Sequence, residues 1–265
     1  MDLRKNPTET IRKAIEDFVA AYRFDHETIT AWEKPVVGFA NGGDPLFREL
    51  KTIVGPTHAL PEELVPGART VIAYFVPFTK AVADANREGD VSTIPWDRAY
   101  LETNRMLVEL NEHLYKLLSA QGFQASRLPA TFNYDKEKLR SDWSHRSAAY
   151  IAGVGTFGVN NMLITRAGCC GRVGSVITDL PIAPTPRPEE EYCLFKQNGT
   201  CGKCMERCPV KSFSVEDGQV IFHRFTCGAH VDKHARTYPD GDADTCGKCM
   251  CAMPCSFRIP GKLKK

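Results

Sequence analysis

Residues 193–209 read CLFKQNGTCGKCMERCP and residues 246–255 read CGKCMCAMPC, and these two runs decide what the C-terminal part of the chain folds around. The chain has 11 cysteines, and all of them lie between Cys169 and Cys255. An odd count, together with a charged N-terminal stretch that has no apolar leader, disfavours a disulfide-stapled secreted domain. We therefore expect a reducing compartment in which the thiolates ligate metal.

The spacing of the first run is C-x2-C-x3-C-P, from Cys201 to Pro209, which matches the tail of the bacterial ferredoxin pattern. In that pattern the C-x2-C pair binds one cluster through a tight turn, and the cysteine before proline ligates the second cluster. Applied here, this exchange predicts two [4Fe–4S] clusters. One would be held by Cys193, Cys201, Cys204 and Cys255, and the other by Cys208, Cys227, Cys246 and Cys249.

Structural zinc and buried free thiols are the alternatives, because isolated C-x2-C pairs suit zinc well. Three features disfavour zinc: at least eight cysteines within 63 residues, a proline directly after Cys208, and no histidine at finger spacing. Cys251 could replace Cys249 as a ligand, but C-x2-C repeats the spacing of the first motif. The cysteines without an assigned role are Cys169, Cys170 and Cys251; the vicinal pair among them is either redox-active or incidental.

The first 190 residues have the pattern of a mixed α/β (α+β) fold. Helical spacing of apolar residues from Thr8 to Tyr22 predicts a first helix, and leucines from 101 to 120 predict a second. Residues 70–76 and 174–178 are apolar, β-branched runs typical of buried strands. Four prolines within 181–188 mark a stiff connector, so we predict domains at 1–190 and 191–265.

Composition restricts the class of protein. The 265 residues are 43% hydrophobic and 25% charged, as in a globular protein with a sizeable core. A net charge of +2 gives no electrostatic case for nucleic-acid binding, and no apolar run approaches the ~20 residues of a membrane span. We expect a cytoplasmic protein that binds no membrane; a homodimer is left open.

A glycine motif, G-x-G-x-x-G, occurs at Gly153, Gly155 and Gly158. As a dinucleotide site it would have to follow a strand and open a helix, with an acidic residue about 20 positions on. Here residues 142–152 read as a helix, and the only acidic residue near that distance is Asp179. We interpret these glycines as sites of close backbone approach rather than as a dinucleotide site.

Two stretches resemble a known family: residues 152–166, AGVGTFGVNNMLITR, and residues 174–181, GSVITDLP. They are similar to the core of the epoxyqueuosine reductases, which belong with the corrinoid-dependent reductive dehalogenases. The cysteine order downstream is similar as well: a ferredoxin-like motif, a lone cysteine, a C-x2-C pair and a last cysteine. The resemblance is firm over about residues 140–258 and looser over 70–125.

The resemblance implies a nitroreductase-like domain that holds cobalamin, followed by a ferredoxin-like domain whose two clusters pass electrons to the corrinoid for reduction of a small molecule. Its cofactor-binding residues would be Gly153, Gly155, Gly158, Asn160, Gly174 and Ser175. FMN is the lesser alternative, because nitroreductase-like folds commonly hold flavin. A second alternative is an electron-transfer or corrinoid-handling protein without substrate chemistry of its own.

The chain also departs from the family. This chain stops ten residues after Cys255, short of the family's further helical region, so we expect a small molecule or a redox partner protein rather than tRNA. The acidic proton donor of an Asp-Ser-Ala-Pro-like stretch is missing. The candidate donors in its place are Asp142, His145 and Tyr150, for which helix packing is the competing interpretation.

Overall fold

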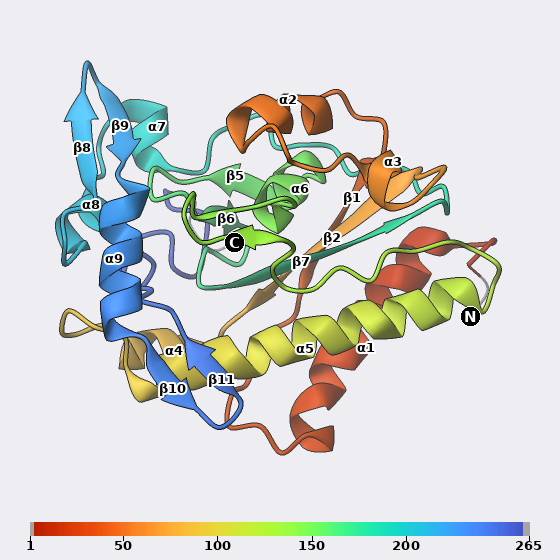
Figure 1. The fold of residues 1–265 in the computed structure, drawn as a ribbon, viewed down its shortest axis with the longest axis horizontal. Helices are drawn as coiled ribbons and strands as arrows, with labels where there is room; N and C mark the ends of the chain where they lie inside the picture. Colours follow the sequence, from red (N-terminus) through yellow and green to blue (C-terminus); the bar gives the residue numbers. More distant parts are fainter. Residues whose placement is uncertain (1–2, 262–265) are drawn as a thin grey trace.

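The computed structural model describes residues 3–261, and its centre is a three-stranded antiparallel sheet (Figure 1). The strands are β1 (Val36–Asn41), β2 (Thr70–Pro77) and β7 (Gly171–Thr178), in the order β1-β2-β7. All eight residues of β2 are buried, as expected for a central strand covered on both faces. Both strands predicted from the sequence, at 70–76 and 174–178, are confirmed.

Helices cover both faces of this sheet (Figure 1). Alternate residues of β2 point to opposite sides: Ile72, Tyr74 and Val76 join one core, and Val71, Ala73 and Phe75 join the other. On the first side lie α1 (Pro7–Asp25) and α5 (Ile94–Ser119). On the second side lie α2 (Leu46–Ile53), α3 (Pro61–Leu64) and α6 (His145–Ile151). The first part of the chain is therefore a three-layered fold with a hydrophobic core on each face of the sheet.

Both long helices predicted from periodicity are confirmed, and their ends follow local chemistry. The side chain of Asn6 accepts a hydrogen bond from the Glu9 amide, which caps α1. Helix α5 begins at Ile94, earlier than the leucine pattern indicated, because Pro95 is well suited to a first helical turn.

The remaining elements are short. The helices are α4 (Lys80–Ala85), α7 (Leu194–Asn198), α8 (Lys203–Arg207) and α9 (Arg224–His234). The strands form two-stranded antiparallel pairs: β3 (Tyr134–Asp135) with β4 (Arg140–Ser141), β5 (Gly155–Phe157) with β6 (Leu163–Thr165), β8 (Phe213–Glu216) with β9 (Gln219–Phe222), and β10 (Arg236–Tyr238) with β11 (Gly241–Ala243). The predicted mixed α/β class is confirmed at this level. The finer likenesses to nitroreductases and ferredoxins stay predictions.

The proline-rich connector and the residues after it pack closely on the first part of the chain. Thr185 exchanges two hydrogen bonds with Phe39 of β1, which holds the connector along the sheet edge. Farther on, the fully buried carboxylate of Asp97 on α5 accepts hydrogen bonds from Arg236 and Tyr238. These contacts place the cysteine-rich segment at one end of the sheet (Figure 1).

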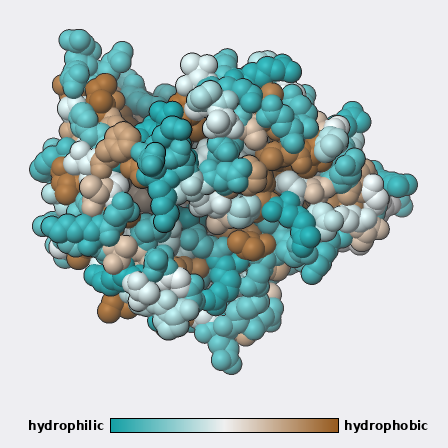
Figure 2. All heavy atoms as spheres, in the orientation of Figure 1, coloured by the Kyte–Doolittle hydropathy of each residue, from teal (hydrophilic) through white to brown (hydrophobic). Residues whose placement is uncertain are grey.

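The surface is mostly polar. Figure 2 shows hydrophilic side chains over most of one face, with apolar groups scattered among them. Exposed apolar residues of the cysteine-rich segment are Val215, Ile221 and Phe225. Among residues 3–261, no helix combines the length and hydropathy that a membrane crossing requires.

Candidate functional site

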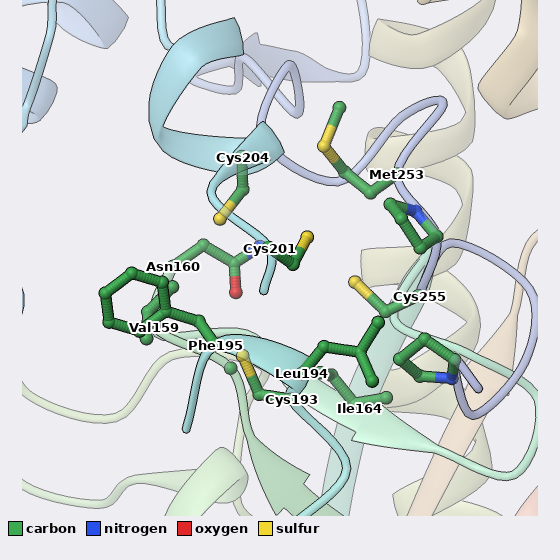
Figure 3. A pocket seen from close by; sticks show the side chains of 13 residues that line it. Val159, Asn160, Ile164, Cys193, Leu194, Phe195, Cys201, Cys204, Met253 and Cys255 are labelled. Atoms are coloured by element: carbon green, nitrogen blue, oxygen red, sulfur yellow. The ribbon is translucent and has the colours of Figure 1, made fainter. Parts of the chain in front are cut away.

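Four of the predicted ligands come together around one pocket. Cys193, Cys201, Cys204 and Cys255 all line it, and their sulfur atoms face a common space in Figure 3. The pocket has an empty volume of about 370 Å³, part of it open to solvent, and is otherwise walled largely by apolar side chains. Residues 62 positions apart in sequence thus meet in the arrangement that the crossed ligand assignment requires.

The thiols of this first quartet influence one another. Burial raises the pKa of Cys204 to about 12, and the neighbouring thiols of Cys255, Cys193 and Cys201 add to the rise. Four thiolates without a cation repel each other, so metal ligation would have to displace their protons. A bound cation would offset this repulsion and so favour the thiolate form of the four cysteines.

The second predicted quartet is also brought together. Burial raises the pKa of Cys227 to about 11, with further contributions from Cys246 and Cys208. The pKa of Cys249 is raised by burial and by the thiols of all three other members. The backbone amide of Ser212 donates a hydrogen bond of 3.3 Å to the sulfur of Cys208.

The two quartets are neighbours. Burial raises the pKa of Cys249 of the second quartet, and Cys204 of the first quartet is among the thiols that add to the rise. Asn160 links them physically: it lines the first pocket, and its side-chain amide donates to the carbonyl of Cys249 at 2.9 Å. Two clusters in these positions would lie side by side.

Local backbone geometry explains why the ligands cross between motifs. Cys204 lies on the five-residue helix α8, which ends at Cys208 in an extended conformation. The chain therefore turns away between these two cysteines, and Pro209 cannot continue the helix. In the second motif, Gly247 has a φ of +70°, and a Cβ there would lie 2.2 Å from the ring of Trp96. Only glycine fits at that position.

The quartets do not have the geometry of a mononuclear site. Within residues 3–261, no three His, Cys, Asp or Glu side chains lie close enough together to hold a single metal ion. Tetrahedral zinc would require thiolates about 2.3 Å from one centre and therefore nearly in contact. A cubane cluster would place its thiolates on separate iron atoms and thus farther apart.

The predicted cofactor-binding glycines contact the chain itself. A Cβ on Gly153 would lie 2.6 Å from the carbonyl oxygen of Pro186, and one on Gly155 would lie 2.1 Å from that of Ile164. Gly174 packs on Tyr74, whose hydroxyl would be 2.4 Å from an added Cβ. Gly158, like Asn160, lines the pocket of the first quartet. Close packing within the fold therefore accounts for the first three glycines.

The order of elements excludes the dinucleotide interpretation of G-x-G-x-x-G. Helix α6 precedes the glycines and strand β5 contains Gly155, so the motif leads from helix to strand. A pyrophosphate-binding glycine loop needs the reverse order, with the amides of a following helix facing the phosphates. The sequence-based doubt about this motif was correct.

The three candidate proton donors have separate surroundings. His145 is 7% exposed, and its ring nitrogens lie 2.8 Å from Ser175 Oγ and 3.0 Å from the carbonyl oxygen of Pro129. Asp142 accepts a hydrogen bond from Thr57 at 2.6 Å. Tyr150 packs against Phe157 and the core beneath α6. None of the three lines the first-quartet pocket.

Ser175, the last predicted cofactor-binding residue, is also internal. It is fully buried, and Trp143 donates a hydrogen bond to its hydroxyl at 3.0 Å. With His145 on the same hydroxyl, Ser175 holds helix α6 against strand β7. The structure thus gives Ser175 and His145 a joint packing role.

Two positively charged residues near the second quartet were not anticipated from the sequence. The fully buried Lys248 lies between Cys246 and Cys249, and its ammonium donates to the carbonyl oxygens of Asn86 and Glu88. Arg146 is exposed, its guanidinium donates to the carbonyl oxygen of Asn161 at 2.6 Å, and its charge interacts with Cys249. The only sequence signal was a lysine inside C-x2-C, which the first motif shares.

No protein-family model matches the sequence, and neither does any curated protein sequence. Solved structures do match. One is epoxyqueuosine reductase from Bacillus subtilis, with its catalytic loop swung out of the active site: TM-score 0.54, 17% identity, covering 92% of this chain and 66% of that one. An epoxyqueuosine reductase in complex with a modified tRNA stem loop matches with a TM-score of 0.53 and 17% identity. That match covers 92% of this chain and 66% of the reductase.

A catabolic reductive dehalogenase is similar too, with a TM-score of 0.53, 16% identity, and coverage of 85% of this chain and 30% of the dehalogenase. The present chain thus spans about two thirds of the length of the epoxyqueuosine reductases and a third or less of the dehalogenase. The resemblance predicted from the glycine and cysteine runs is confirmed in three dimensions. This chain has a fold similar to that of the epoxyqueuosine reductases and reductive dehalogenases.

Proposed function

We propose that the chain is an iron–sulfur oxidoreductase that uses two [4Fe–4S] clusters to deliver electrons to a small molecule. The observation that carries this proposal is the convergence of two cysteine quartets, each drawn from both motifs. Bound clusters would supply single-electron transfer at low potential. Similarity to two classes of reductase supports the redox assignment.

The residues around the two quartets determine the polarity and the charge that a bound cluster would experience. The walls around the first quartet are largely apolar, and such surroundings tune the potential of a cluster bound there. Beside the second quartet, Arg146 and Lys248 place positive charge near the thiolates. Such charge stabilises the reduced, more negative state of a cluster.

Cobalamin is the electron acceptor that the family resemblance implies, but four of the six residues assigned to it pack against the chain itself: Gly153, Gly155, Gly174 and Ser175. The ring of Tyr74 occupies the space beside Gly174, and Ser175 is fully buried. Neither residue therefore has a face open to a corrin. We therefore derive no step through a corrinoid. A small-molecule substrate remains the proposal in place of tRNA, which one structural neighbour binds as a stem loop.

Metal analysis of anaerobically purified, reconstituted protein tests the proposal. We expect about eight iron atoms per chain, little zinc, and a broad visible absorption that bleaches with dithionite and returns with an electron acceptor. Cobalt bands or an extractable flavin would identify a further cofactor. Stoichiometric zinc without reducible absorbance would contradict the proposal.

A pure electron-transfer protein is the second candidate, and the packing contacts of His145 favour it, because they occupy both ring nitrogens of one of the three candidate proton donors. It predicts clusters that reduce a partner protein without turnover of any epoxide or halide. Turnover of such a compound by the protein with its clusters intact would exclude this candidate.

A further inference from the structure

Three cysteines lie outside both quartets, and all three are sealed in the protein. Cys169, Cys170 and Cys251 are each at most 1% exposed. They share an apolar core with the predicted ligands Cys193, Cys249 and Cys255. Because no external molecule reaches their sulfurs, any role must be exerted on neighbouring groups.

Only one of these three thiols reaches a predicted ligand. The sulfur of Cys169 lies 3.9 Å from that of Cys255, within hydrogen-bond distance for two sulfurs. Cys170 instead donates to the carbonyl oxygen of Met250 at 3.1 Å, and Cys251 accepts from the Asn86 amide at 3.6 Å. Cys170 also contacts the sulfurs of Cys169 and Cys251, so the three buried thiols form a chain of which only Cys169 contacts a predicted ligand.

The backbone fixes the pair of sulfurs. The amide of Cys169 donates to the carbonyl of Cys255 at 2.9 Å, and that of Cys170 donates to the carbonyl of Ser256 at 3.1 Å. Gly168 permits this approach, because a Cβ there would lie 2.3 Å from the carbonyl oxygen of Ser256. Backbone hydrogen bonds between residues 169–170 and residues 255–256 therefore hold the sulfurs of Cys169 and Cys255 in contact.

The two sulfurs differ in what they face. Cys255 lines the pocket with the other three members of its quartet, whereas Cys169 lies behind it and does not line the pocket. A thiol is protonated at neutral pH under ordinary conditions, so Cys169 can donate its S–H. A ligating thiolate carries negative charge and accepts it.

We propose that the Cys169 thiol donates a hydrogen bond to the ligating sulfur of Cys255 and raises the reduction potential of the cluster held by the first quartet. This inference rests on the proposed function. Hydrogen bonds to cluster sulfurs stabilise the more negative reduced state and so favour reduction. Cys169 is thus a positioning residue that acts through a ligand, as the Ser212 amide does on Cys208.

Potentiometric titration of the reconstituted full-length chain, followed by EPR, tests this role in Cys169→Ala, Cys169→Ser and the control Cys170→Ala. We expect every variant to keep the iron content of the wild type. Cys169→Ala should lower the equilibrium constant for reducing one cluster about threefold, roughly 28 mV at 59 mV per tenfold change. Cys169→Ser keeps an O–H donor and should stay near the wild type, as should Cys170→Ala.

Loss of about half of the iron in Cys169→Ala would overturn the inference by making Cys169 itself a ligand. Equal potentials in the wild type and Cys169→Ala, or equal shifts in Cys169→Ala and Cys170→Ala, would also overturn it, since packing alone would then explain the contact. A wild-type protein that binds no iron would instead refute the proposed function. The two failures are therefore distinguishable.

Discussion

His145 accepts a hydrogen bond from Ser175 and donates one to the carbonyl of Pro129, which can only accept. The carbonyl contact places a proton on Nε2, and in the neutral ring Nδ1 then accepts from Ser175. Burial lowers the pKa of His145 to about 4, against an ordinary value of 6.5. The ring is thus neutral at pH 7 and has both nitrogens occupied, which suits packing better than proton donation.

This pKa predicts a pH dependence of stability. Above pH 6.5 the ring is neutral in both the folded and the unfolded chain, and its full contribution to folding is present. As the pH falls toward 4 the unfolded chain binds the extra proton, so the contribution is lost. Relative to His145→Asn, the wild type should lose about 2 kcal/mol of unfolding free energy between pH 7.5 and pH 5.

Urea unfolding of both proteins at the two pH values measures this difference. Since all other titrating groups are common to the pair, they cancel. A difference in unfolding free energy that does not change with pH would show that His145 is not buried as a neutral ring.

The two CGKC runs show that a sequence motif does not determine the environment of each side chain within it. They have identical residues, yet Lys203 is exposed while Lys248 is fully buried on the carbonyls of residues 86 and 88. The ligand spacing was readable because it depends on the turn within the motif. The environments of the two lysines could not be predicted, because they depend on which distant segment of the chain packs against each motif.

Among the elements, the β5–β6 pair depends on glycine. In β5 a Cβ at Gly155 would lie 2.1 Å from the backbone oxygen of Ile164 in β6, and backbone cannot move aside cheaply. Gly155→Ala should therefore reduce the free energy of unfolding by about 1–3 kcal/mol. Urea unfolding measures this change.

Gly43 supplies the matched control, because an added Cβ would meet nothing closer than 3.5 Å, at the side chain of Asn41. Gly43→Ala should change stability by less than about 0.5 kcal/mol. Equal effects of the two substitutions would show that the close approach of β5 to β6 is not as described.

Helix α5 and the β10–β11 pair are joined by two carboxylates in different environments. Asp97 is fully buried and accepts from Arg236 and Tyr238, whereas Asp240 pairs with Arg98 and Arg105 near the surface. Asp97→Asn should cost about 2 kcal/mol, as for hydrogen bonds to a buried charge. Asp240→Asn should cost less than about 1 kcal/mol.

Hydrogen exchange of residues 236–243 in the two variants reports this difference locally. Faster exchange is expected in Asp97→Asn and nearly unchanged exchange in Asp240→Asn. The reverse order would mean that the surface pairs, not the buried carboxylate, hold β10–β11 on α5.

The strength of the sequence pattern explains which elements were predictable. Strands β2 and β7 are continuous apolar runs, and α1 and α5 are long amphipathic helices, so length and periodicity identified them. The short strand pairs have two to four residues per strand, too few for a period to show. Their positions depend on tertiary contacts such as that of Leu139 against Gly228.

At the scale of the whole molecule, the cysteine-rich segment is a continuation of the α/β body and shares its packing. The buried Lys248 and Asp97 each join residues more than 130 positions apart in the sequence. The 4 + 4 partition of the cysteines stays a prediction from spacing, and the structure brings Cys193, Cys201, Cys204 and Cys255 around one pocket. The surroundings of each quartet were not predictable, because residues 158–164, Trp96 of α5 and residues 86–88 supply them.

The crossed ligation of two clusters is the central claim, and iron content with EPR of single cysteine variants tests it most directly. We predict about eight iron atoms in the wild type and about four in Cys204→Ser, Cys208→Ser and Cys246→Ser. Although Cys204 and Cys208 share a motif, Cys208→Ser and Cys246→Ser should lose the same cluster and give matching spectra, while Cys204→Ser should keep that cluster and lose the other. Matching spectra for Cys204→Ser and Cys208→Ser, or zinc in place of iron, would contradict the account.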